Sequence, residues 1–126
     1  MVPHTIVSVV DDDESVRESL PDLLGELGFE ARSFASAEEF LASDAVRHTR
    51  CLIIDIALPG MSGPKLTREL NRRGQRMSTI FITGHGDDGI RARLIQQGAT
   101  ECLFKPFTDD EVRAALDAAL PGHGPR

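Results

Sequence analysis

Short apolar runs alternate with helix-like patterns along the 126 residues of this chain. Runs of four or five mostly apolar residues are short for helices and predict buried strands. They lie at residues 6–10, 31–34, 51–54, 79–82 and 101–104. After each run come segments with helical spacing or helix-capping signals, as at Val16, Leu20 and Leu24. The pattern therefore predicts five strand–helix units.

Local signals predict where the helices begin and end. Ser/Thr-x-x-Glu segments at residues 36–39 and 108–111 are typical of capping boxes. Glycines that follow helical segments predict their ends: Gly28, Gly74 and Gly98. Pro64 suits the first turn of the third helix, and Ile90, Leu94 and Ile95 predict the apolar face of the fourth.

Pro21 conflicts with the first helix. A proline inside a helix removes a backbone hydrogen bond and costs about 3 kcal/mol. The sequence therefore predicts either a kink at Pro21 or a helix that restarts with Ser19 as its cap.

Five successive strand–helix units predict a parallel sheet with helices on both faces. The common solution at this length is a doubly wound α/β fold with the flavodoxin-like strand order 2-1-3-4-5. We expect residues 1–120 to form one domain and residues 121–126 a flexible tail. In that order Cys51 and Cys102 lie about 10 Å apart, too far for a disulfide, so we expect two buried thiols.

Composition and charge argue against some classes of function. The formal net charge of −6 argues against direct nucleic-acid binding, which needs a basic surface. The chain contains no apolar run of membrane-spanning length and no leader-like N-terminus, so we expect no membrane association and a cytoplasmic location.

Chemically reactive side chains follow the predicted strands. In open α/β sheets, sites form beyond the carboxyl ends of the strands, at the switch point between strands 1 and 3. The residues at these ends are Asp11 to Glu14, Asp55, Thr83 and Lys105. Two carboxylates 4 Å apart repel by about 4 kcal/mol at an effective dielectric of 20, so a converging cluster favours a bound cation. Mg²⁺ prefers such oxygen ligands, and with Lys105 and a nucleophilic carboxylate the set suits phosphoryl transfer.

These motifs resemble the response-regulator receiver domain of two-component signalling. The resemblance covers residues 6–120. Within the family, the chain is most like receivers that precede LuxR-type DNA-binding domains. Its motifs are the acidic residues after the first strand, Asp55 with the Leu58–Gly63 loop, the Ile82–Gly84 segment and the Lys105–Phe107 segment.

The resemblance implies that Asp55 accepts a phosphoryl group from a sensor histidine kinase or a phosphotransfer protein. It also implies a bound Mg²⁺, with Mn²⁺ as a substitute. Asp12 would be a direct ligand, Asp11 would act mainly through water, and Asp55 and the backbone carbonyl of Ala57 would complete the set.

The family further implies that Thr83 and Lys105 contact the phosphoryl oxygens and that the Lys105–Pro106 peptide bond is cis. Ala57 and His85 would influence the lifetime of the phosphoryl group. The chain would be a signalling protein rather than an enzyme, limited to its own phosphotransfer and autodephosphorylation. After phosphorylation, the face formed by the fourth helix, the last strand and the last helix would control a partner or output domain, or would form a homodimer.

One residue departs from the family pattern. Receivers usually carry Tyr or Phe three residues before the lysine, as a switch coupled to the threonine, and here that residue is Cys102. Strand alternation places Phe104 on the same face as Cys102. The phosphorylation chemistry is thus expected to be intact, while the usual readout is in question.

Three alternatives stay open on the sequence. A haloacid-dehalogenase-like phosphatase would use Asp11 and Asp13, but this chain is short for that family and Asp55 would be unexplained. A degenerate receiver that never binds phosphate is favoured by Cys102 and opposed by the complete acidic set. A flavodoxin shares the fold, but the acidic loop after the first strand would repel a flavin phosphate.

Overall fold

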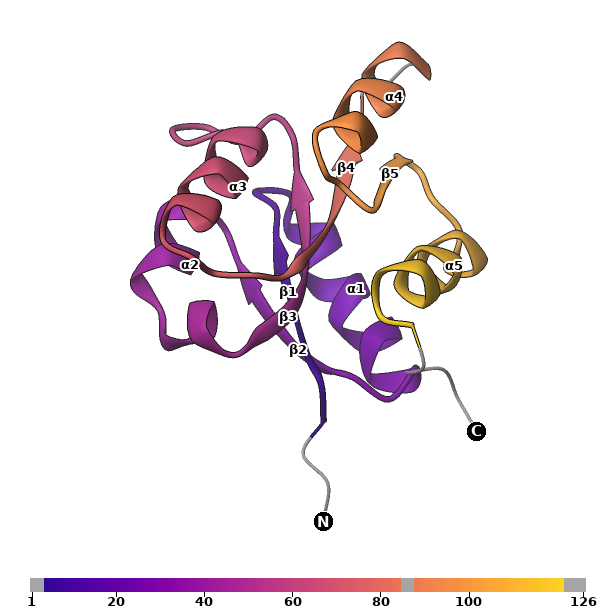
Figure 1. Ribbon diagram of the computed structural model, residues 1–126. Coiled ribbons are helices and arrows are strands. Elements are labelled where there is room, and N and C mark those ends of the chain that lie inside the picture. The colour runs from indigo at the N-terminus through magenta and orange to yellow at the C-terminus, as the bar shows by residue number, and fades with distance from the viewer. Residues whose placement is uncertain (1–3, 85–87, 122–126) are drawn as a thin grey trace.

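The computed structural model describes residues 4–84 and 88–121. Its five strands form one parallel sheet in the order β2-β1-β3-β4-β5, which confirms the predicted doubly wound fold (Figure 1). The strands are β1 (Ile6–Val10), β2 (Glu30–Phe34), β3 (Thr49–Asp55), β4 (Ser78–Thr83) and β5 (Glu101–Phe104). The helices are α1 (Glu14–Glu26), α2 (Ala37–Ala42), α3 (Gly63–Arg72), α4 (Asp88–Gln96) and α5 (Asp109–Ala119), with a 3₁₀ turn at Asp44–Arg47.

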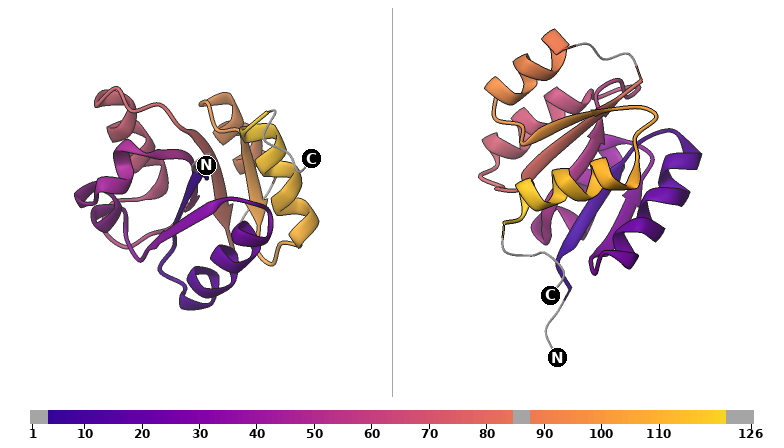
Figure 2. Two further views of the ribbon diagram at one scale, coloured as in Figure 1. Left: turned by 90° about the horizontal axis from the view of Figure 1, so that it is seen from below. Right: turned by 90° about the vertical axis from the view of Figure 1, so that its right-hand side faces the viewer.

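The helices cover the sheet in two layers (Figures 1 and 2). On one face α1 and α5 pack over Val7, Ile53 and Ile80. On the other face α2, α3 and α4 pack over Ile54 and Phe81. Alternate residues of each central strand enter opposite clusters, because successive side chains of a strand point to opposite faces. The central strands β1, β3 and β4 are thus buried on both faces, whereas the edge strand β2 is largely exposed.

The two cysteines belong to different faces. Cys51 lies in the cluster beneath α1 and α5, and Cys102 lies in the cluster beneath α2, α3 and α4. Both are buried free thiols, as predicted. Burial raises the pKa of Cys51 to about 12, so this thiol stays protonated at neutral pH.

Helix α1 runs through Pro21 without a break, so the predicted restart at Ser19 is wrong. Asp13 is the N-cap, and its carboxylate accepts the Ser15 N–H at 2.9 Å. Ser19 instead donates its hydroxyl to the Ser15 carbonyl. Burial of Leu20 and Leu24 on either side of the proline contributes about 1.5–3 kcal/mol each, enough to offset the missing hydrogen bond.

Two further local predictions differ in detail. Thr108 and Glu111 form the complete capping box of α5, whereas Ser36 only accepts the Glu39 N–H at the start of α2. Leu94 is buried in the core, but Ile95 is 40% exposed, so the apolar face of α4 does not include it. In the described part of the chain, no helix has both the length and the apolar character required to cross a bilayer.

Candidate metal and phosphoryl-acceptor site

Three carboxylates converge at the carboxyl edge of the sheet. One oxygen from each of Asp11, Asp12 and Asp55 lies within 4.8 Å of the other two. Asp11 and Asp12 follow the end of β1, and Asp55 ends the neighbouring strand β3. Asp11 is fully buried and Asp55 is 7% exposed, whereas Asp12 faces solvent. The switch-point rule thus predicted correctly that the acidic run after β1 meets Asp55, but of that run only Asp11 and Asp12 join the cluster, since Asp13 caps α1.

Backbone contacts fix the turn that carries Asp11. The Asp11 N–H donates to the Phe34 carbonyl of β2 at 3.1 Å. Its Oδ1 accepts the Asp13 N–H at 2.9 Å, and Arg17 Nη1 donates to its carbonyl at 3.0 Å. The Arg17 contact was not anticipated from the sequence. Together these bonds hold the Asp11 carboxylate beneath the acidic turn, where water does not reach it.

Lys105 supplies the positive charge of the cluster. Its Nζ lies 2.9 Å from Asp11 Oδ2 and 3.0 Å from Asp55 Oδ2. The Lys105 N–H donates to the Thr83 carbonyl at 2.8 Å, and the Lys105–Pro106 peptide bond is cis. Burial alone would lower the pKa of Lys105, but the contacts with both carboxylates outweigh it and raise the pKa. Lys105 is therefore a permanent cation between two acids at neutral pH.

The negative charge of the Asp11 carboxylate is only partly compensated by its surroundings. Its buried Oδ2 pairs with Lys105 Nζ at 2.9 Å, and Asp55 shares the same ammonium group. Burial is the largest cause that raises the pKa of Asp11, and the negative charge of Asp55 adds to it. The Asp13 N–H and Lys105 oppose this shift without cancelling it. A hard divalent cation with oxygen ligands fits this cluster, because it would reduce the repulsion between the carboxylates.

Asp55 is held by the loop that follows it. Its Oδ1 accepts the Ala57 N–H at 2.9 Å, and Ile56 is joined to the sheet through the Ile82 carbonyl at 3.0 Å. Gly63 begins α3 so close to Asp55 that a Cβ there would lie 2.7 Å from the Asp55 carbonyl oxygen. The close approach of loop and helix therefore requires glycine.

The other predicted site residues are placed around this cluster. Thr83 is 5% exposed and follows Ile82, the cross-strand partner of Asp55. Ala57 is exposed in the loop after β3. His85 lies outside the described residues. Cys102 is 3% exposed, and Phe104 packs against the same core cluster, as strand alternation predicted.

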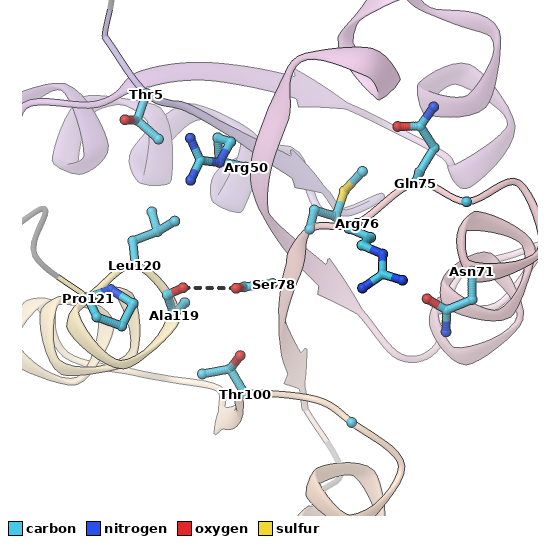
Figure 3. A pocket seen from close by; sticks show the side chains of 13 residues that line it. Thr5, Arg50, Asn71, Gln75, Arg76, Ser78, Thr100, Ala119, Leu120 and Pro121 are labelled. Atoms are coloured by element: carbon cyan, nitrogen blue, oxygen red, sulfur yellow. Dashed lines mark hydrogen bonds between the residues drawn. The ribbon is translucent and has the colours of Figure 1, made fainter.

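A separate hollow of about 810 Å³ opens at the opposite, amino edge of the sheet (Figure 3). Thr5, Arg50, Thr100 and Pro121 line it, and Ser78 donates its hydroxyl to the Ala119 carbonyl at 2.8 Å. None of the described residues that line it is acidic. The described lining of this hollow therefore contrasts with the carboxyl edge, where Asp11, Asp12 and Asp55 converge.

Comparison with known proteins agrees with this geometry. Residues 7–117 match the family model of the response regulator receiver domain. The chain is 45% identical over 114 residues to nodulation protein W of Bradyrhizobium diazoefficiens, covering 90% of this chain and 50% of that protein. It is 41% identical over 114 residues to transcriptional regulatory protein FixJ of Azorhizobium caulinodans, covering 90% and 54%. The chain thus spans about half the length of these curated relatives.

Solved structures give the same answer. The crystal structure of FixJ-N superimposes with a TM-score of 0.79 at 36% identity, covering 94% of each chain. The response regulator StyR superimposes with a TM-score of 0.81 at 40% identity, covering 93% of this chain and 59% of that one. Sequence, fold and the acidic cluster at the switch point thus agree, and the chain belongs to the response regulator receiver domain family of two-component signalling.

Proposed function

We propose that Asp55 accepts a phosphoryl group from a phosphohistidine of a sensor histidine kinase or a phosphotransfer protein. The observation that carries this proposal is the convergence of three carboxylates within 4.8 Å, with Asp11 fully buried and Lys105 paired with both Asp11 and Asp55. Asp11, Asp12, Asp55 and the Ala57 carbonyl would hold Mg²⁺ or Mn²⁺. The bound ion would neutralise charge on the transferring phosphoryl group.

The chain's own groups would carry the transfer as follows. An Asp55 carboxylate oxygen attacks the phosphorus, a P–O bond forms and the P–N bond to the donor imidazole breaks. The electron pair goes to the imidazole nitrogen, which leaves the phosphorus. Lys105 then pairs with the phosphoryl oxygens, and the Thr83 hydroxyl donates to them. Water later hydrolyses the acyl phosphate, at a rate that Ala57 and His85 would modulate. The protein would thus catalyse only its own phosphorylation and dephosphorylation.

Phosphorylation of Asp55 would change the conformation of the face formed by α4, β5 and α5. A homodimer or an output domain would use this face, and the relatives named as transcriptional regulators favour control of transcription by a longer protein. Cys102 at the usual aromatic position would alter the readout without altering the chemistry. The site and its partners would operate in the cytoplasm.

The test of the acceptor is labelling by acetyl phosphate with Mg²⁺, followed by intact-protein mass spectrometry. Wild-type protein should gain a single phosphoryl group, and the Asp55→Asn variant should gain none, because an amide lacks the nucleophilic oxygen. Asp22→Asn, an exposed substitution on α1 with the same change of charge, should label like wild type. Retained labelling of Asp55→Asn would reject the assignment, and steady turnover of phosphate esters would favour the phosphatase alternative.

A further inference from the structure

Glu38 connects helix α2 to the loop that follows Asp55. It lies in the first turn of α2, and its Oε2 accepts the Met61 N–H at 3.0 Å. The same oxygen lies 2.7 Å from the position that a Cβ on Gly60 would occupy. Gly60 also has a φ of +76°, which favours glycine. The backbone of this loop and the Glu38 carboxylate are therefore fitted closely to each other.

The loop needs such a contact because much of it is exposed. Its inner end is fixed by the Ala57 N–H on Asp55 and by the bond from Ile56 to the sheet. Farther along, Leu58 is buried, but Pro59 and Gly60 face solvent. The Glu38 carboxylate joins this exposed stretch to a helix outside the loop. Displacement of the stretch would be transmitted to Ala57, because only Leu58, Pro59 and Gly60 separate it from Met61.

We infer that Glu38 is a positioning residue for the phosphoryl-acceptor site: it holds the Ile56–Ser62 loop so that the Ala57 backbone stays beside Asp55. This inference rests on the proposed function, since Ala57 is there assigned to the metal and to Asp55. Glu38 touches neither the carboxylate cluster nor the transferring group in this assignment. It acts through the loop backbone alone.

The expected effect is on metal affinity. When a binding-competent conformation is only partly populated, the apparent Kd rises in inverse proportion to that population. Loss of one exposed hydrogen bond from a backbone N–H to a carboxylate corresponds to about a fivefold change in an equilibrium. The Glu38→Ala variant should therefore need more Mg²⁺ for half-maximal labelling by acetyl phosphate, by a factor of up to about five. At saturating Mg²⁺ its labelling rate should match that of wild type, because the ion then selects the competent loop.

Two matched variants distinguish an effect of the Glu38 hydrogen bond from an effect of negative charge on α2. Glu39→Ala removes the same charge from the next residue of α2, and it should label with the Mg²⁺ dependence of wild type. Among residues 4–84 and 88–121, the Glu39 side chain has no hydrogen bond or ion pair, so we expect its removal to leave the loop in place. Glu38→Gln keeps an oxygen that can accept the Met61 N–H, and it should restore most of the Mg²⁺ affinity.

Gly60 provides an independent check. Gly60→Ala should weaken Mg²⁺ binding in wild type, because the new methyl group meets the Glu38 carboxylate and the φ is strained. In the Glu38→Ala background the steric part disappears, so the same substitution should have a smaller effect. This non-additivity is expected only when the two residues act on each other.

The outcomes are distinguishable. If Glu38→Ala and Glu39→Ala share the Mg²⁺ dependence of wild type, the inference is wrong while the proposed function stands. An equal loss of affinity in Glu38→Ala, Glu38→Gln and Glu39→Ala would assign the effect to charge and would also overturn it. If wild type itself takes no label, the proposed function fails and the inference falls with it. Faster amide hydrogen exchange at Met61 in Glu38→Ala would support the loop mechanism directly.

Discussion

Asp11 and Asp12 are neighbours in the chain with opposite surroundings. Asp11 is fully buried and balanced in part by Lys105, so its charge is costly before any ion binds. Asp12 is exposed, and its charge is well solvated in the metal-free protein. The two residues should therefore contribute differently to cation binding. The buried charge of Asp11 should be stabilised most by a cation, whereas Asp12 should add affinity for the cation with little effect on the stability of the fold.

This division predicts the behaviour of Asp12→Asn. Without metal, its free energy of unfolding should stay within about 0.5 kcal/mol of wild type, as for most surface substitutions. Mg²⁺ at ten times Kd should stabilise wild type by about 1.4 kcal/mol, and this gain should be lost in Asp12→Asn. Thermal unfolding with and without MgCl₂, against KCl at equal ionic strength, measures both. A variant that keeps the full Mg²⁺ shift would remove Asp12 from the metal site.

At this scale, sequence reasoning succeeded where the fold dictates the position. Asp11, Asp12, Asp55 and Lys105 were found because parallel strands bring their carboxyl ends to one edge. Glu38 was missed because its contact depends on the conformation of a long side chain reaching a loop 23 residues away in the sequence. A capping-box spacing assigned Glu39 and Ser36 a local role, and it carried no signal for this longer contact.

At the scale of elements, α4 is attached to β5 by a two-point ion pair. Arg91 Nε and Nη2 donate to Glu101 Oε1 and Oε2 at 2.8 and 3.0 Å. Leu94 adds a buried apolar contact, while Ile95 on the same helix remains exposed. Sequence periodicity assigned both residues to one apolar face, although consecutive residues of a helix lie about 100° apart around its axis. Tertiary packing of α4 against the sheet decides which of the two side chains is covered, and the helical pattern alone does not contain this information.

The Arg91–Glu101 pair predicts a pH dependence of stability. The Arg91 hydrogen bond lowers the pKa of Glu101 below its ordinary value of 4.5. A lowered carboxyl pKa gives stability that is present above 4.5 and is lost as the pH falls through the folded-state value. Glu101→Gln should therefore lower the free energy of unfolding at pH 7 by about 0.5 kcal/mol, a small figure because the pair is partly exposed.

Urea unfolding of wild type and Glu101→Gln at a series of pH values measures this effect. The difference between them should shrink toward zero as the pH drops below 4.5. Glu26→Gln, an exposed substitution on α1, should show no comparable convergence. A Glu101→Gln difference that is constant with pH would mean that the ion pair does not contribute to stability.

At the scale of the whole molecule, the sheet divides the core into two separate parts. Ile53 and Ile80 are cross-strand partners in the cluster beneath α1 and α5, whereas Ile54 belongs to the cluster on the opposite face. All three side chains are at most 2% exposed. The backbone of the sheet lies between the clusters, so a void on one face should relax within that face. The five strand–helix units predicted helices on both faces of the sheet, although not which helices would fill each side.

Double-mutant cycles test that division. Ile53→Val, Ile54→Val and Ile80→Val should each cost about 0.5–1.5 kcal/mol in urea unfolding. The pair Ile54/Ile80, on opposite faces, should be additive within about 0.5 kcal/mol, because the two side chains belong to separate core clusters. The pair Ile53/Ile80, in direct contact within one cluster, should deviate by more than that. Equal coupling in the two pairs would mean that strain crosses the sheet, and that the faces, including the one that carries α4, respond to perturbation as a single unit.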